Sequence, residues 1–230
     1  MEKEPKKIII FGDSQLASLA HFYFKHDSPH EVVAFTVDEA YRKNDTYENL
    51  PLVAFEKVED HFPVEDYLMF LPISFKKMNH LRMEKYETAK KKGYHFASYV
   101  SSKATTWPDL QIGENCFIFE DNTIQPYVKI GNNCILWSGN HIGHHTTIED
   151  HVFVTSHVVI SGACHIKNFS FFGVNSTVRD ETIIAEATLV GMGANIIHDT
   201  KPGEIHLGHK SKVMSKKSID LDSISHKSEG

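Results

Sequence analysis

Histidine is concentrated in one short part of this chain. Six of the sixteen histidines lie between His141 and His165, and two of them, His144 and His145, are adjacent. Imidazole is the side chain whose ordinary pKa lies nearest to neutral pH, so a positioned histidine can take a proton from a hydroxyl or an amine. The adjacent pair is therefore a candidate general-base site, provided that the surrounding sequence directs the rings to a surface.

The sequence around these histidines repeats every six residues. Residues 112–201 divide into fifteen six-residue units without an insertion or a gap, from IGENCF to IIHDTK. The first place of a unit is Ile, Leu or Val in fourteen cases and Phe172 in the other, and the fifth place is small or β-branched except at Asn122 and Asn140. This period predicts a coil of short parallel strands in which three units make one turn and residues eighteen apart stack.

The repeat also assigns a direction to each side chain. First-place and fifth-place residues are expected inside the coil, whereas His144 and His145 occupy third and fourth places and should face outward. Gly162 lies eighteen residues after His144 and should leave open space beside it. Glycine at the second place of five units is expected where a Cβ would crowd a corner or where φ is positive.

The residues before the repeat have a different pattern, in which apolar runs alternate with amphipathic segments. We expect strands at residues 7–11, 31–37, 52–55 and 67–71, and helices at residues 15–24 and 75–92. The sequence therefore predicts a small α/β domain over residues 1–95, a β-helix over residues 96–210 and a mobile tail over residues 211–230.

The turn after the first expected strand could hold a ligand. Gly12, Asp13 and Ser14 lie between this strand and its helix, and Asp38 follows the second strand. A β–α–β unit of this kind is half of a nucleotide-binding fold, although only one glycine stands where a nucleotide loop has two or three. The alternative interpretation is a strand–turn–helix that binds nothing.

Composition restricts the class of protein. The chain has 230 residues, 41% of them hydrophobic, and a net charge of −6, so it can form real cores and carries no basic stripe for nucleic acid. Its apolar runs are shorter than the roughly 20 residues of a membrane span. The three cysteines all occupy fifth places and are expected to be buried and unpaired. Since no signal peptide is evident, we expect a cytoplasmic protein.

A hexapeptide repeat that follows an α/β domain resembles the left-handed β-helix acyltransferases. The order of the two domains narrows the resemblance to the sugar O- and N-acyltransferases similar to the sialic-acid O-acetyltransferase family and to bacterial nucleotide-amino-sugar N-acetyltransferases, and it covers about residues 6–208. It implies a left-handed coil, a homotrimer and acetyl-CoA bound between adjacent coils. The activity it implies is transfer of an acetyl or other acyl group to a hydroxyl or amine of a sugar or nucleotide sugar in bacterial surface-glycan synthesis, with no metal.

The resemblance also assigns roles to individual residues. His144 matches the general base, and His145 stands where an Asp or Glu is usual, so we expect the orienting partner to be Glu149, Asp150 or a group of the neighbouring subunit. The implied CoA-binding residues are Gly162, Val174, Met192 and Gly193, and the implied acceptor-binding residues are Gly12, Asp13, Ser14, Asp38, Asn140 and His141.

The sequence departs from the family pattern at several places near the acceptor. Gln15 replaces a glycine, and residues 72–74 replace a Gly-Asn turn. Trp137 replaces a small polar residue, and Phe153 stands where some relatives have a second histidine. These departures predict a reshaped acceptor pocket.

Apolar residues at outward places favour contact between subunits. Phe119, Tyr127, Trp137 and Phe153 are expected on the outside of the coil, where such groups predict a trimer interface.

Two other functions stay open. A γ-carbonic-anhydrase-like enzyme would use the histidines as zinc ligands, but that family lacks the α/β domain and has an early Arg–Asp pair that this coil lacks. A β-helix without catalytic activity, serving as a scaffold, is the second alternative.

Overall fold

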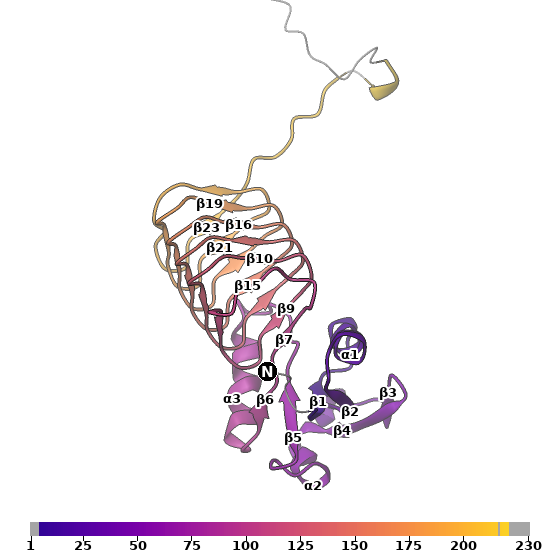
Figure 1. Cartoon of the computed structure of the whole chain (residues 1–230). Helices are drawn as coiled ribbons and strands as arrows, with labels where there is room; N and C mark the ends of the chain where they lie inside the picture. Colours follow the sequence, from indigo (N-terminus) through magenta and orange to yellow (C-terminus); the bar gives the residue numbers. More distant parts are fainter. Residues whose placement is uncertain (1–4, 216, 221–230) are drawn as a thin grey trace, which may run out of the picture.

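The computed structural model describes residues 5–215 and 217–220, which form a sheet with helices followed by a coil of short strands (Figure 1). The sheet and its helices comprise β1 (Lys7–Phe11), α1 (Gln15–Asp27), β2 (Glu31–Val37), the 3-10 helix η1 (Glu39–Tyr41), β3 (Thr46–Tyr47), β4 (Leu50–Ala54), the 3-10 helix η2 (Phe55–Lys57), α2 (Val58–His61), β5 (Tyr67–Phe70), α3 (His80–Lys91) and β6 (His95–Phe96).

The first six strands form one sheet in the order β3-β4-β2-β1-β5-β6. The short β3 is antiparallel to β4, and the other neighbours are parallel. The strands predicted at residues 7–11 and 31–37 are confirmed at both ends. The helix predicted from residue 75 instead begins at His80, because Lys77, Met78 and Asn79 have φ angles of 53°, 48° and 67°, which are incompatible with a right-handed helix.

Helices cover both faces of this sheet. On one face, α1 buries Ala17, Ala20 and Phe24 against the strands. On the other face, α2 and α3 bury Val58 and Tyr86 in a separate cluster. A largely parallel sheet needs such cover on both sides, because its strands are apolar on both faces.

The coil has three flat faces, each a stack of two-residue strands. The first face contains β7 (Tyr99–Val100), β9 (Phe117–Ile118), β12 (Ile135–Leu136), β15 (Phe153–Val154), β18 (Phe171–Phe172), β21 (Leu189–Val190) and β23 (Ile205–His206). The second face contains β10 (Thr123–Ile124), β13 (His141–Ile142), β16 (Val159–Ile160), β19 (Thr177–Val178) and β22 (Asn195–Ile196). The third face contains β8 (Gln111–Ile112), β11 (Lys129–Ile130), β14 (Thr147–Ile148), β17 (His165–Ile166) and β20 (Ile183–Ile184).

The predicted stacking register is confirmed. Ile130 pairs in parallel with Ile112 on one side and with Ile148 on the other, each eighteen residues away. The interior also follows the prediction, since the first-place and fifth-place side chains form one continuous buried core, in which Cys116, Cys134 and Cys164 are unpaired thiols. The register ends at β23, where Leu189 pairs with Ile205.

Each corner of the coil turns through a left-handed residue at the fourth place. His145, His151 and Ala163 have φ angles of 60°, 63° and 56°, and most other fourth-place residues are similar. The second-place glycines serve another purpose, since a Cβ on Gly113 would lie 2.7 Å from the backbone of Gly131 on the next turn. Of the two reasons expected for these glycines, close approach is therefore correct and positive φ is not.

The first face of the coil packs against α1 of the same chain. Tyr23 of α1 contacts the rings of Phe117 and Phe119 at centroid distances of 5.8 Å and 5.2 Å. Phe119 and Phe153 are only 1% and 3% exposed. The prediction that these outward aromatic residues contact another subunit is therefore wrong for this pair, because Tyr23 of α1 covers Phe119 and Phe75 packs across Phe153 within the same chain.

A fully buried arginine joins α3 to the coil. The guanidinium of Arg82 donates hydrogen bonds to the backbone oxygens of Asn133 (3.1 Å), His151 (3.0 Å) and Ile73 (3.1 Å), and to Oδ1 of Asn79 (3.1 Å). Burial lowers the pKa of Arg82 to about 10, which leaves the group charged at neutral pH. Carbonyl dipoles thus take the place of water around this charge.

His151 lies beside this arginine at the same corner. Its Nδ1 is 2.9 Å from Nδ2 of Asn133, and its ring stacks on Phe169 with centroids 5.0 Å apart. Burial lowers the pKa of His151 to about 4, so the folded protein keeps this imidazole neutral well below the usual value of 6.5.

The stability of the protein should therefore fall below pH 6.5. Between pH 6.5 and 4 the unfolded chain binds a proton at His151 that the folded chain does not bind, so protonation favours unfolding. We expect this residue to remove about 3 kcal/mol from the free energy of unfolding across that window. Urea unfolding at several pH values should show that the free energy of unfolding falls less steeply with decreasing pH in His151→Gln than in wild type. Glutamine does not titrate and can still accept a hydrogen bond from Asn133. An identical slope in both proteins would contradict the assignment.

The last described residues leave the coil. Residues 209–215 lead away from its end, and η3 (Ser218–Asp220) follows (Figure 1). Most of the tail predicted at residues 211–230 falls on residue 216 and residues 221–230, which lie outside the described part of the chain.

Across the described ranges 5–215 and 217–220, no helix combines the length and the apolar character needed to cross a bilayer.

Candidate active site

His144 and His145 lie at the corner between the second and third faces, in the turn that joins β13 to β14. Both side chains are exposed, as the repeat predicts. The backbone N–H of His144 donates to Oε1 of Gln125 at 2.8 Å, which ties this corner to the turn below it. The pair is therefore presented to solvent from a rigid scaffold.

The two imidazoles contact each other directly. Nδ1 of His144 is 3.1 Å from Nδ1 of His145, and the rings are nearly perpendicular, with an interplanar angle of 85°. One nitrogen must donate and the other must accept. If His144 donates, its Nε2 keeps a free lone pair, which is the tautomer that a general base requires. Tyr127 supports the arrangement, with its ring 4.6 Å from that of His145.

The carboxylates expected to orient His144 are engaged elsewhere. Glu149 accepts from Lys167 at 2.9 Å, from Nε2 of His165 at 2.7 Å and from the backbone N–H of Asn168 at 3.2 Å, and these hydrogen bonds keep its pKa low despite its partial burial. Asp150 accepts from the backbone N–H of Asn132 at 2.6 Å. Within one chain, neither carboxylate is the partner of His144, and His145 is the side chain that contacts it. A group of the neighbouring subunit stays a prediction.

Gly162 makes room for the base. A Cβ at this position would lie 2.7 Å from Cε1 and 2.9 Å from Nε2 of His144. The space that the glycine leaves is thus occupied by the imidazole itself. Any side chain at position 162 would push the ring out of this position.

The other residues assigned to CoA lie at a different corner. Val174, Met192 and Gly193 are in turns between the first and second faces, whereas Gly162 is between the second and third. The second face separates the two groups within one chain. Val174 and Met192 are 41% and 73% exposed, and nothing lies within 4 Å of the position that a Cβ on Gly193 would take.

The glycine turn, residues 12–14, lies at the carboxyl end of β1, as the predicted β–α–β unit requires. Gly12 has a φ of 110° and donates from its N–H to the oxygen of Thr36 at 2.7 Å. Ser14 precedes α1, and its side chain makes no capping hydrogen bond. Asp38, at the end of β2, forms an ion pair with Lys85 at 2.5 Å. This carboxylate is therefore already partnered by α3.

The prediction for Asn140 is wrong. Its side chain is 1% exposed and donates to Oδ1 of Asn122 at 3.1 Å, while its own oxygen accepts from the N–H of Val158 at 2.8 Å. The fifth place points inward, so this amide belongs to a ladder inside the coil and cannot reach a substrate. His141, one residue later, is half-buried on the outer surface of the second face.

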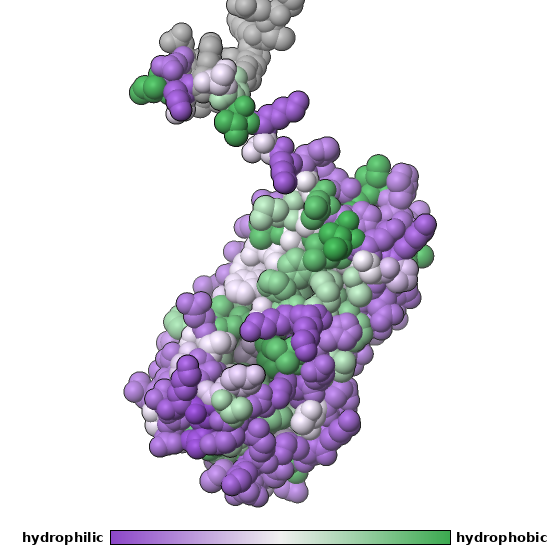
Figure 2. Space-filling view, turned by 180° about the vertical axis from the view of Figure 1, so that it is seen from behind, coloured by the Kyte–Doolittle hydropathy of each residue, from purple (hydrophilic) through white to green (hydrophobic). Residues whose placement is uncertain are grey.

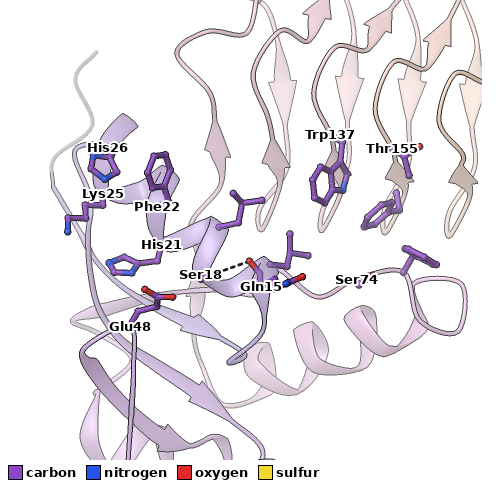
Figure 3. A pocket seen from close by; sticks show the side chains of 14 residues that line it. Gln15, Ser18, His21, Phe22, Lys25, His26, Glu48, Ser74, Trp137 and Thr155 are labelled. Carbon is purple, nitrogen blue, oxygen red and sulfur yellow. Dashed lines mark hydrogen bonds between the residues drawn. The ribbon is translucent and has the colours of Figure 1, made fainter.

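A cavity of about 840 Å³ lies between α1 and the coil. Its walls come from α1, from Glu48 beside the β3–β4 hairpin, from the loop at Ser74 and from the first face with its following corner (Figure 3). The predicted acceptor residues Gly12, Asp13, Ser14, Asp38, Asn140 and His141 are not among its lining residues. The structure thus places this cavity beside the glycine turn, at Gln15, but not over it.

The cavity brings together the positions at which the sequence departs from the family pattern. Gln15, Ser74, Trp137 and Phe153 all line it, although they come from four separate segments. Sequence reasoning marked these residues singly and did not place them together. The sequence analysis did not identify the face of α1 that carries Phe22 and Lys25 as part of a binding region. The signal that could have identified it is Phe22, a large apolar residue on the exposed side of an amphipathic helix.

Within residues 5–215 and 217–220, no three His, Cys, Asp or Glu side chains are grouped so that they could hold a metal ion.

The coil matches a known sequence family. Residues 96–200 match the family model described as GMPPB C-terminal domain. A comparison with curated proteins gives no match.

Several solved structures are similar to the chain over nearly its whole length. One is a histidine-to-asparagine variant of perosamine N-acetyltransferase from Caulobacter crescentus in complex with CoA and GDP-perosamine, with 18% identity, a TM-score of 0.79 and coverage of 91% of this chain and 97% of that chain. WeeI from Acinetobacter baumannii AYE has 18% identity, a TM-score of 0.75 and coverage of 89% and 97%. The acetyltransferase domain of PglB from Neisseria gonorrhoeae FA1090 has 16% identity, a TM-score of 0.56 and coverage of 91% and 100%. The chain therefore has the fold of the hexapeptide-repeat sugar acyltransferases, with its coil as a left-handed β-helix.

Proposed function

We propose that the protein transfers an acetyl or other acyl group from acyl-CoA to an amine or hydroxyl of a nucleotide-linked sugar, in the cytoplasm. The observation that carries this proposal is the exposed His144, held over Gly162 with its Nδ1 against His145. The similarity of fold to acetyltransferases crystallised with CoA and GDP-perosamine supports the choice of donor and acceptor.

His144 is the base in this proposal. Its Nε2 takes the proton of the acceptor amine or hydroxyl, while Nδ1–H donates to His145. Acetyl-CoA, when bound, supplies the thioester carbonyl that the acceptor attacks. As the new bond to the acyl carbon forms and the C–S bond breaks, His144 can return its proton to the departing thiolate. A base near neutral pKa suits both transfers.

The residues assigned to CoA fit part of that molecule. The exposed Val174 and Met192 offer apolar contact to a pantetheine arm, and the open space at Gly193 lets a chain approach the backbone. Residues 1–95 would act as the nucleotide-sugar domain, with the cavity beside α1 as its binding region.

We propose that the complete site forms between subunits of a homotrimer. His144 lies at the corner opposite the first face, and the cavity lies on that face, so one chain cannot bring them together. Apolar surface suited to association remains near the end of the coil (Figure 2). In the last turn of the coil, Ile205 and Leu207 are 67% and 76% exposed. Light scattering should give three times the monomer mass of 26.1 kDa, and a monomer would overturn this arrangement.

His145 should control the pH dependence of the base. A carboxylate at this position would stabilise the imidazolium of His144, so His145→Glu should move the acidic limb of the pH–rate profile to higher pH than in wild type. His145→Ala should lower turnover by less than His144→Ala, because Nδ1 then relies on water for its hydrogen bond. Profiles of kcat against pH would measure both effects. Coincident profiles for wild type and His145→Glu would show that His145 does not act on the base.

A further inference from the structure

The floor of the cavity is aromatic and rigid. Trp137 is half-buried and stacks on Phe119, with centroids 4.6 Å apart and planes 10° apart. Phe75 packs across Phe153 at 5.4 Å and remains 47% exposed. Trp137 and Phe75 therefore present flat apolar surface to the cavity, supported by the buried rings of Phe119 and Phe153.

The opposite end of the cavity carries charge. Lys25 and His26 belong to the last part of α1, His21 lies one turn before, and Glu48 projects from the hairpin across from them (Figure 3). Burial and the nearby Lys25 lower the pKa of His21, so this ring stays neutral at physiological pH. Lys25 is therefore the positive charge at this end and Glu48 the negative one.

The size and division of the cavity suit a ligand with two chemically different ends. A volume of about 840 Å³ lies within the range of small-molecule sites, which runs from about 300 to 1,000 Å³. Gln15 and Ser18 lie between the two ends and offer hydrogen bonds. The glycine turn, at which phosphate is expected by resemblance, does not line this space.

We propose that the acceptor sugar stacks on the floor formed by Trp137 and Phe75, and that its diphosphate lies against Lys25 rather than at the glycine turn. Glu48 then faces the ribose hydroxyls. This inference rests on the proposed function and adds the means of recognition: the acceptor presents an apolar ring face, and Trp137 determines specificity. An aromatic floor binds a sugar through apolar contact area, whereas a polar floor would bind it through hydrogen bonds.

Substitution of the floor should weaken acceptor binding selectively. With GDP-perosamine as the probe, Trp137→Ala should raise the KM for the acceptor by about 10- to 100-fold and change the KM for acetyl-CoA less than about twofold. Trp137→Phe keeps a ring and should stay within about threefold of wild type. Phe75→Ala, from an exposed loop, repeats the test without disturbing the stack on Phe119. Equal acceptor KM values in wild type, Trp137→Ala and Phe75→Ala would contradict the proposed stacking of the sugar on this floor. A fall in kcat with an unchanged acceptor KM would contradict it as well.

The position of the diphosphate can be tested by a pair of variants. Lys25→Ala should raise the acceptor KM more than Ser14→Ala does, because the first removes the proposed phosphate contact and the second alters only the glycine turn. Lys91→Ala, at the exposed end of α3, is the matched control and should leave both KM values unchanged. If Ser14→Ala raised the acceptor KM more than Lys25→Ala did, the diphosphate would have to bind at the glycine turn, and this part of the inference would be wrong.

Direct binding separates this inference from the proposed function. The chain has two tryptophans, so Trp107→Phe leaves Trp137 as the single tryptophan, which can be excited selectively over the tyrosines at about 295 nm or above. Titration of that variant with GDP-perosamine should change its fluorescence to saturation, and GDP alone should bind more weakly. Saturable binding without acetyl transfer would support the acceptor subsite and contradict the proposed acyltransferase activity. Acetyl transfer without any change in Trp137 fluorescence, together with an unchanged acceptor KM in Trp137→Ala, would contradict the subsite and support the proposed acyltransferase activity.

Discussion

His144→Ala should lower the turnover of acyl transfer by about 10²- to 10⁴-fold, the usual contribution of a positioned general base. Three features of the structure lead to this expectation. The repeat turns the side chain outward, the contact between Nδ1 and His145 leaves Nε2 available, and Gly162 leaves the ring room to lie along the corner. Removal of the imidazole leaves the scaffold intact, because the ring is exposed and contributes nothing to the core.

The control for this experiment is His198→Ala. His198 occupies the third place of its unit at the same kind of corner, fifty-four residues or three turns after His144, and is also exposed. Its loss should leave turnover close to wild type. The His144→Ala protein should keep its oligomeric mass and its affinity for CoA, measured by light scattering and calorimetry. If both variants kept turnover within about threefold of wild type, far below the range for a general base, another group would have to be the base.

Arg82→Ala should destabilise the folded protein by about 3–5 kcal/mol, because it leaves several buried carbonyl oxygens without a donor and opens a cavity between α3 and the coil. The guanidinium of Arg82 reaches Ile73 and Asn79 beside α3 and Asn133 and His151 in the coil, so one side chain satisfies acceptors on both sides. Its loss should loosen the attachment of α3. Denaturant unfolding, followed by circular dichroism, would measure the change in the free energy of unfolding.

A matched surface arginine provides the comparison. Arg42 pairs with Glu39 and Asp45 at the exposed η1 turn, and Arg42→Ala should leave the unfolding midpoint nearly unchanged. Arg82→Lys should fall between wild type and alanine, since an ammonium keeps the charge but cannot span the same acceptors. Equal midpoints for Arg82→Ala and Arg42→Ala would show that the buried arginine does not stabilise the junction.

The six-residue period predicted most of the coil because it acts through local and repeated contacts. Each turn buries its first-place and fifth-place residues only against the turns above and below, so the direction of every side chain follows from its number. The same rule applied to Asn140 would have placed it inside. The resemblance assigned it to the acceptor instead, and the buried ladder with Asn122 shows that the register was the better guide.

Contacts between distant segments could not be predicted in this way. The register correctly turned Phe119 and Phe153 outward, but nothing in the repeat states that α1 covers that face. The cavity depends on the same docking, since its walls come from α1, a loop and the coil. The contact of His144 with His145 was not predicted for a related reason: within the chain the sequence analysis named only the carboxylates Glu149 and Asp150, whereas the structure places the ring of the adjacent histidine 3.1 Å away.

The stoichiometry of the reaction would decide whether the protein transfers an acyl group to a sugar. The purified protein would be incubated with acetyl-CoA and a panel of nucleotide-linked amino sugars that includes GDP-perosamine, and free CoA and acetylated sugar would be quantified together. We predict equal amounts of both products from wild type and a loss of both in His144→Ala. Absence of acetylated sugar from every acceptor, or CoA release at the same rate in wild type and His144→Ala, would contradict the assignment of this chain as a sugar acyltransferase.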